Sequence, residues 1–241
     1  MHLQYLKRFY PDFKGKKVLE LGCGRGDFLL ECHKEGLDII GVDINSEYIK
    51  ISEEKIKKSG FEPHIILAKG EELPFKDDYF DFINCAQVLE HTNNPEGVLK
   101  ECYRILKKDG CLFVTIPNKF SMRDPHYKIL FLNWLPKTLK EKYIKIRKVK
   151  RNPYRCPDNQ NINDMHYYTY FQFKHMVKQN EFFYLDTKKE QLNNPELILN
   201  CRFKKIIHFL NRMGLNFIIN FAYFFSTIFY LDSFHFLLKK K

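Results

Sequence analysis

Residues 18–28 read VLELGCGRGDF, and this stretch decides the fold because an apolar run meets a turn with glycines at 22, 24 and 26. The pattern is typical of a buried strand that ends in a tight turn and opens a helix. Glycine has no Cβ, so the backbone can bend sharply there and a ligand can approach the chain. A dinucleotide-binding fingerprint would read GxGxxG, whereas here the third glycine comes one position earlier. The glycines alone predict a nucleotide-like ligand without fixing its class.

The same stretch opens an alternation of strands and helices that runs to Pro117. Strands are expected at 18–21, 39–43, 64–68, 80–85 and 110–116, and helices at 27–34, 46–58 and 95–106. Ser46 is the expected cap of the second helix. Short strands separated by helices predict an α/β fold: a Rossmann-like, doubly wound, mostly parallel seven-stranded sheet with helices on both faces. Ligands of such sheets bind at the carboxyl ends of the strands.

The alternation stops after Pro117. Thr169 and Gln172 form an expected capping box for a helix that reaches about Asn180. Two more strands are expected, at 182–190 and 233–240, so helical insertions follow the fifth strand and precede the last. We expect a single domain over 1–241, made of a cofactor-binding half (15–118), a basic insertion or substrate cap (119–165) and a C-terminal part (166–241).

The C-terminal part contains an apolar helical segment, 206–231, that has three interpretations. Residues 213–231 are 19 positions without a charge, interrupted by Asn216, Asn220, Ser226 and Thr227. A spanning helix needs about 20 mostly apolar residues, and the central asparagines disfavour it. A helix packed over the site is the plainer interpretation, and a helix lying in a membrane interface is the third.

The positive charge is concentrated in two places. The formal net charge is +11, and residues 137–155 hold nine basic side chains against the single acid Glu141. Lys239, Lys240 and Lys241 close the sequence. Such a patch attracts phosphates on lipid head groups, nucleic acid or a substrate. The alternative is that lysine merely occupies solvated positions.

The cysteines and the first residues indicate the compartment. Seven cysteines are scattered without a CxxC pair, and residues 1–17 contain no uninterrupted apolar run. We therefore expect a cytoplasmic protein with reduced thiols, no secretory signal and no metal site.

Four further features follow the glycine turn at informative distances. Asp43 closes the second strand, where a carboxylate can accept both hydroxyls of a ribose. The third strand leads into AKGEELPF (68–75), and the fourth runs through DFINCAQVLEH (81–91). The segment VLKECYRILKKDGCLFVTIPN (98–118) then reads as a helix, a glycine turn and a strand.

Together these motifs resemble the class I S-adenosylmethionine-dependent methyltransferases. The likeness is closest to the subgroup that includes quinone-biosynthesis and other small-molecule methyltransferases, and it covers residues 15–118 and, more loosely, 165–190. The GxGxG turn is usual in that family. The resemblance implies S-adenosyl-L-methionine as methyl donor, with S-adenosylhomocysteine as product. The cofactor-binding residues that it implies are Glu20, Gly22, Cys23, Gly24, Gly26, Asp43, Ile44, Gly70, Glu71, Cys85 and Gln87.

Within that set, Glu20 and the glycine turn would line the methionine moiety, Asp43 would hold the ribose, and Ile44 would pack on the adenine. Gly70 and Glu71 would border the adenine, while Cys85 and Gln87 would close the pocket beside the sulfonium. Lys69 occupies a position where many relatives have Asp, so backbone groups or Glu71 would have to recognise the adenine amino group.

Two histidines are candidates for a general base towards a hydroxyl acceptor. His91 ends the fourth-strand motif and His166 lies in DMHYYTY; a structural role is the alternative for both. The expected function is methyl transfer to a small-molecule or lipid-linked acceptor that is anionic and partly apolar, with contact to an anionic membrane surface at the inner membrane face. The alternatives are an RNA methyltransferase that uses 137–155, a non-catalytic membrane- or partner-binding module, and a Rossmann dehydrogenase, which the GxGxG spacing disfavours.

Overall fold

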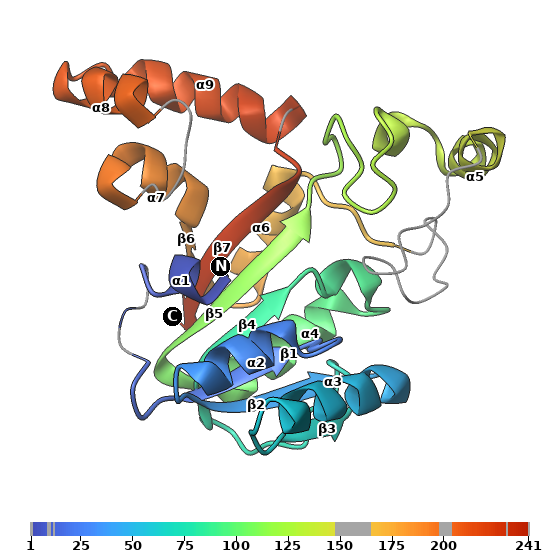
Figure 1. Cartoon of the computed structure of the whole chain (residues 1–241). Coiled ribbons are helices and arrows are strands. Elements are labelled where there is room, and N and C mark those ends of the chain that lie inside the picture. The colour runs from blue at the N-terminus through green and yellow to red at the C-terminus, as the bar shows by residue number, and fades with distance from the viewer. Residues whose placement is uncertain are drawn as a thin grey trace.

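The computed structural model describes residues 2–8, 11, 13–147, 165–197, 204–229 and 231–240. Its centre is a seven-stranded sheet of order β3-β2-β1-β4-β5-β7-β6. Only β7 runs against its neighbours within this sheet, pairing antiparallel with β5 and β6, while the other paired strands are parallel. Figure 1 shows the sheet between two helical layers. The predicted doubly wound α/β fold is confirmed.

The strands are β1 (Lys17–Leu21), β2 (Asp38–Asp43), β3 (Ile65–Leu67), β4 (Phe80–Ala86), β5 (Leu106–Pro117), β6 (Phe182–Asp186) and β7 (Ser233–Lys240). The α-helices are α1 (His2–Leu6), α2 (Asp27–Lys34), α3 (Ser46–Lys58), α4 (Pro95–Ile105), α5 (Lys137–Ile146), α6 (Tyr170–Gln179), α7 (Thr187–Asn193), α8 (Lys204–Arg212) and α9 (Asn216–Phe229). Short 3₁₀ turns lie at η1 (Leu89–His91), η2 (Leu132–Trp134) and η3 (Pro195–Leu197).

The core has one apolar layer on each side of the sheet. Val18 of β1 packs in the layer that α1, α2 and α3 complete. Leu19 and Leu21 point the other way, into the layer that α4 and α6 cover. Side chains alternate between the two faces of a strand, so a sheet covered on both sides needs apolar residues at nearly every position. That requirement explains why most residues of β1 and β4 are apolar, while the buried polar side chains Glu20 and Asn84 bond to each other.

Several expected boundaries hold and others shift. Helices α2 and α3, strand β7 and the Thr169–Gln172 capping box agree with the sequence. The cap of α3 is Asn45, however, because its side chain accepts from the backbone N–H groups of Glu47 and Tyr48. The expected strand 182–190 ends at Asp186, whose carboxylate caps α7 at Lys189 N–H.

The two insertions come from different places in the chain and lie apart from each other. Between β5 and α6 the chain forms η2 and α5, whereas α7, η3, α8 and α9 come between β6 and β7 (Figure 1). The apolar segment 206–231 is two helices, because Gly214 separates α8 from α9 with a left-handed φ of 70°. Among the described residues, no helix has both the length and the apolar character needed to cross a membrane. The basic residues beyond Arg147 in the 137–155 patch lie outside the described residues.

Candidate functional site

A cavity of about 470 Å³ opens at the carboxyl ends of β1, β2 and β4. This is the edge where ligands of doubly wound sheets bind, and the volume suits a small-molecule site. Its lining residues are Gly22, Gly24, Asp43, Ile44, Tyr48, Ala68, Lys69, Gly70, Glu71, Gln87, Val88, His91, Thr92 and Asn93. The structure thus brings together seven of the expected cofactor-binding residues: Gly22, Gly24, Asp43, Ile44, Gly70, Glu71 and Gln87.

The glycine turn forms one wall of the cavity. The N–H groups of Gly22 and Cys23 both donate to the carbonyl of Val42, which ties the turn to β2. A Cβ on Gly22 would lie 2.5 Å from Val88 Cγ2, so the turn and the segment after β4 approach as closely as they do only because this residue is glycine. Gly26 lies away from the lining. A Cβ there would meet Ser52 Oγ at 2.0 Å, so this glycine allows α2 to pack on α3.

Asp43 lies at the end of β2 with its carboxylate held by two backbone groups. Oδ2 accepts from Gly24 N–H at 2.7 Å, and Oδ1 accepts from Asn45 N–H at 2.9 Å. These bonds also fix the glycine turn against the start of α3. Each carboxylate oxygen has two acceptor directions, so the residue can hold the turn and still accept from a ligand's hydroxyls. The capping interpretation and the ligand-binding interpretation of Asp43 are therefore compatible.

Glu20, Cys23 and Cys85 are expected cofactor residues that do not line this cavity. Glu20 is paired in β1 with Asn84 of β4, whose Nδ2 donates to Glu20 Oε2 at 2.6 Å. Burial raises the pKa of Glu20 well above its usual range, and the bond from Asn84 opposes that shift. Cys85 is fully buried in the apolar layer under α4 and its pKa is raised well above normal by burial, so it is a core thiol.

The loop after β3 supplies the opposite wall through Lys69, Gly70 and Glu71. Arg104 of α4 holds the rest of this loop by donating to the carbonyls of Leu73 and Phe75. Glu101 completes the clasp, because its carboxylate accepts from Leu73 N–H at 2.9 Å and from Arg104. Ile44 stands exposed at the rim, with 65% of its surface accessible, where an apolar ring could cover it.

Gln87 follows β4 in a left-handed conformation, with φ of 60°. Its backbone N–H donates to the Thr115 carbonyl, and its side-chain Nε2 donates to Thr115 Oγ1 at 3.1 Å. Non-glycine residues in this conformation carry strain and concentrate at functional sites. Tyr48, Val88, Thr92 and Asn93 also line the cavity although the sequence reasoning did not select them. Their only signal was proximity to the expected motifs.

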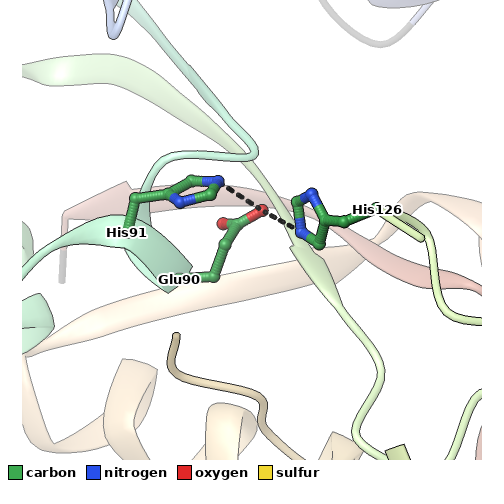
Figure 2. A group of neighbouring side chains, drawn as sticks. All are labelled: Glu90, His91 and His126. Atoms are coloured by element: carbon green, nitrogen blue, oxygen red, sulfur yellow. Dashed lines mark ion pairs between the residues drawn. The ribbon is translucent and has the colours of Figure 1, made fainter. Parts of the chain in front are cut away.

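His91 lines the same cavity and also belongs to a group with the buried residues Glu90 and His126. Glu90 Oε1 lies 4.0 Å from the Nε2 atom of each histidine, and Figure 2 shows both rings directed at this carboxylate. Glu90 is fully buried, and burial raises its pKa to about 8. His126 comes from the segment after β5, which the sequence reasoning did not connect with η1.

His166 lies outside the first cavity and lines a second one of about 330 Å³, which also includes Lys119, Lys140 and Tyr168. Its backbone N–H donates to the Glu90 carbonyl at 2.8 Å, so the two regions are joined directly. A third cavity, of about 410 Å³, is lined by Asn93 of the first cavity and by Lys119 of the second. The three cavities therefore adjoin one another through shared lining residues, at the carboxyl ends of the parallel strands.

Comparison with known proteins gives the family of the first half. The family model described as a methyltransferase domain matches residues 19–114, which contain the glycine turn, Asp43 and the β4 motif. This segment therefore matches the methyltransferase domain family. The predicted class I family is confirmed, and the match ends where the sequence departs from the strand–helix alternation.

The relatives of this methyltransferase domain share the same half. The ubiquinone/menaquinone biosynthesis C-methyltransferase UbiE of Vibrio vulnificus is 35% identical over 132 residues, which are 51% of this chain and 50% of that protein. The demethylmenaquinone methyltransferase of Anoxybacillus flavithermus is 34% identical over 122 residues, or 47% of this chain and 51% of that protein. The chain thus spans about half the length of the curated relatives that it matches.

Solved structures extend the likeness of fold to the whole chain. A SAM-dependent methyltransferase from Archaeoglobus fulgidus aligns over 99% of this chain and 94% of its own, with a TM-score of 0.55 and 20% identity. The PH0226 protein from Pyrococcus horikoshii OT3 aligns over 99% of this chain and 87% of its own, with a TM-score of 0.59 and 15% identity. At these identities the likeness establishes the fold alone.

The contacts of Glu101 and Arg104 with the loop after β3 predict how the stability of the fold depends on pH. The bond from Arg104, opposed by partial burial, lowers the pKa of Glu101. A depressed carboxyl pKa stabilises the folded state above the unfolded pKa of about 4.3, and that contribution disappears as pH falls through the lower folded pKa. The Glu101→Gln variant should lose about 1 kcal/mol of unfolding free energy at pH 7. The loss should shrink steadily below pH 4, as measured by urea unfolding of variant and native protein.

Glu72→Gln is the matched control, because Glu72 lies in the same loop but its side chain is exposed. It should change the unfolding free energy by less than about 0.5 kcal/mol at either pH. A Glu101→Gln deficit that is as large at pH 3 as at pH 7 would contradict the role given to the carboxylate.

Proposed function

We propose that this chain is an S-adenosylmethionine-dependent methyltransferase whose donor site is the cavity at the ends of β1, β2 and β4. The observation that carries the proposal is the arrangement of Gly22, Gly24 and Asp43 around that cavity. The matched methyltransferase domain and the names of the relatives support this choice of donor.

The residues present fit such a donor. Asp43 offers carboxylate oxygens to a pair of ribose hydroxyls, and the exposed Ile44 offers an apolar surface to an adenine. Gly22 and Gly70 leave backbone without side chains at the cavity wall. Bound there, S-adenosylmethionine supplies a methyl group on a sulfonium that already makes a good leaving group. The chain's own task is to orient the acceptor and to exclude water, so catalysis is mainly proximity and alignment.

Asp43 provides the sharpest test of the donor site. The Asp43→Asn variant keeps the shape but loses the negative charge that strengthens hydrogen bonds to hydroxyls, which are worth about 1.5–3 kcal/mol each to a charged group. Affinity for S-adenosylhomocysteine should fall at least tenfold in isothermal titration calorimetry.

Asp38→Asn is the control for that experiment, because Asp38 begins β2 at the end of the strand opposite Asp43 and is exposed. It should leave affinity unchanged. Native affinity in Asp43→Asn, or no binding of the ligand by the native chain, would contradict the proposed donor site.

We further propose that the acceptor is an anionic, partly apolar molecule, either small or lipid-linked. The support comes from the cavity that contains Lys119, Lys140 and His166 beside Tyr167 and Tyr168. Lys140 is buried and its Nζ lies 5.4 Å from the centre of the Tyr167 ring. Buried lysine and tyrosine together suit a phosphate or carboxylate attached to an apolar body. His166 lines this cavity and is the general-base candidate there for a hydroxyl acceptor.

Labelling tests the acceptor class. Methyl-labelled S-adenosylmethionine is incubated with native protein and a cell lysate, which is then separated into organic-soluble, small-molecule, RNA and protein fractions. Label should enter the organic-soluble or small-molecule fraction. Label in RNA would instead favour the RNA methyltransferase alternative.

Lys140→Ala should lower incorporation at least tenfold without changing the affinity for S-adenosylhomocysteine, because the removed cation faces the acceptor cavity. Lys142→Ala, on the exposed face of the same helix α5, is the control and should retain native incorporation. Equal incorporation by both variants would contradict the assignment of the acceptor cavity.

We also propose that helices α8 and α9 contact an anionic membrane surface, which would give access to a lipid-linked acceptor. The two helices and the turn between them leave large apolar side chains in solvent: Ile206, Phe209, Met213, Phe217, Phe221, Phe224 and Phe225. Helix α8 also carries the basic residues Lys204, Lys205 and Arg212. An exposed aromatic face next to basic residues is the composition of helices that lie in a membrane interface.

Vesicle sedimentation tests this contact. Native protein should partition onto vesicles with anionic lipids, and the Phe217→Ser/Phe221→Ser double variant should partition at least tenfold less, since burying one Phe is worth roughly 1.5–3 kcal/mol. Phe183→Ser is the control, because Phe183 on the edge strand β6 is 62% exposed, close to the 66% of Phe221. Equal partition of native protein and double variant would exclude a role for this face.

A further inference from the structure

Three metal-ligating side chains converge beside the donor cavity. Glu90 and His91 lie in η1 after β4, and His126 lies in the chain after β5. One donor atom from each residue lies within 4.8 Å of the other two. Figure 2 shows the two imidazole rings on either side of the carboxylate, with the ion-pair lines meeting at one of its oxygens.

The carboxylate of Glu90 is buried, and its capacity to accept hydrogen bonds is not met by the described residues. Glu90 is 0% exposed, and neither of its oxygens has a hydrogen-bond partner among the described residues. The 4.0 Å separations to the two Nε2 atoms are too long for hydrogen bonds. A buried carboxylate in this state costs several kcal/mol unless a proton or a cation neutralises it. Glu20, another buried acid of this region, receives a short bond from Asn84 and illustrates the usual solution.

The surrounding chain holds the three residues in place. Asp124, itself buried, accepts from the backbone N–H groups of His126 and Tyr127 at 2.9 and 2.6 Å. Its other oxygen accepts from the Tyr167 hydroxyl at 2.9 Å. On the other side, the His166 N–H donates to the Glu90 carbonyl. These contacts fix the backbone at Glu90 and His126, so the two side chains start from defined positions.

We propose that Glu90, His91 and His126 bind one divalent transition-metal cation, of the class of Zn²⁺ or Co²⁺. Two imidazole nitrogens and one carboxylate oxygen suit these ions better than Mg²⁺ or Ca²⁺, which prefer oxygen ligands alone. A cation about 2.0–2.2 Å from each ligand atom separates those atoms by roughly 3–4 Å. The carboxylate lies 4.0 Å from each Nε2 and all three atoms lie within 4.8 Å of one another, so side-chain rotations that draw them together complete the site.

The site has a consequence that rests on the proposed function. His91 belongs both to this group and to the lining of the donor cavity, so the cation lies at the wall between donor and acceptor. A divalent cation there can polarise an acceptor oxygen and lower its pKa, which replaces a general base at His91. The hydroxyl proton then leaves to solvent or to His166.

Metal binding is measured directly, without turnover. Metal-free protein is titrated with Zn²⁺ by calorimetry and with Co²⁺ by visible absorption, and S-adenosylhomocysteine binding is measured on the same samples. The native chain should bind one equivalent of each metal, and the cobalt spectrum should show nitrogen and oxygen ligands. His126→Ala should weaken Zn²⁺ binding at least a hundredfold, beyond the ~10–100-fold typical of outer contacts. Affinity for S-adenosylhomocysteine should stay native in this variant, which separates the metal site from the donor site.

Two more variants complete the test. His208→Ala removes an exposed histidine of α8 and should bind metal like the native chain. Glu90→Gln removes the ligand but also the buried charge, so without metal it should unfold at the same urea concentration or a higher one, while losing the added stability that Zn²⁺ gives the native chain. Binding of less than one equivalent by the native chain, or equal binding by His126→Ala and His208→Ala, would overturn the proposal.

Discussion

The hydrogen bond from Gly24 N–H to the Asp43 carboxylate fixes the geometry on which the rest of the site depends. It joins the turn after β1 to the end of β2, while the second carboxylate oxygen reaches Asn45 and sets the start of α3. The turn must then lie close to β2 and to Val88, and only glycine at position 22 leaves room for that approach. One carboxylate thereby shapes the wall of the cavity, positions two helices and remains able to accept from a ligand. Its place at the end of a parallel strand follows from the sheet order, since β1 lies between β2 and β4 and the three strands end together.

The cofactor half could be predicted from sequence because its signals are local. A turn, a capping residue and a strand-closing Asp each act within a few residues, so α2 and α3 were placed correctly from their flanking residues. Prediction failed where both faces of a strand are buried. In β4 apolar residues occur on both faces of the strand, so the sequence does not say that Cys85 points into the layer under α4 and away from the cavity. The cap of α3 was misplaced by one residue because Asn45 and Ser46 are both good capping residues.

The residues that sequence reasoning missed belong to contacts between distant segments. His126 has no motif around it, and only the paths of the chain after β4 and after β5 bring it to Glu90. Lys119 and Lys140 are likewise two among forty basic residues in the sequence, and folding selects them by placing both in one cavity with His166. The sequence locates the positive charge in 137–155. The structure shows in addition that Lys140 of α5 is buried, whereas Lys142 of the same helix is exposed to solvent.

The same division between local and distant contacts separates the cavity proposed for the donor from the cavities beside it. The donor cavity is built by short motifs within residues 22–93, which lie inside the segment that matches the methyltransferase domain model. The neighbouring cavities take most of their walls from Lys119, from η2 and α5, and from the segment 165–179, all beyond the family match, while residues 93–96 inside the match also line the third cavity. An insertion can change these walls without disturbing β1, β2 or the glycine turn, because its contacts with the sheet run through the loop ends after β4 and β5. The backbone bond from His166 to Glu90 is such a connection, and it places the buried carboxylate where the segment that matches the family model meets the segment beyond that match.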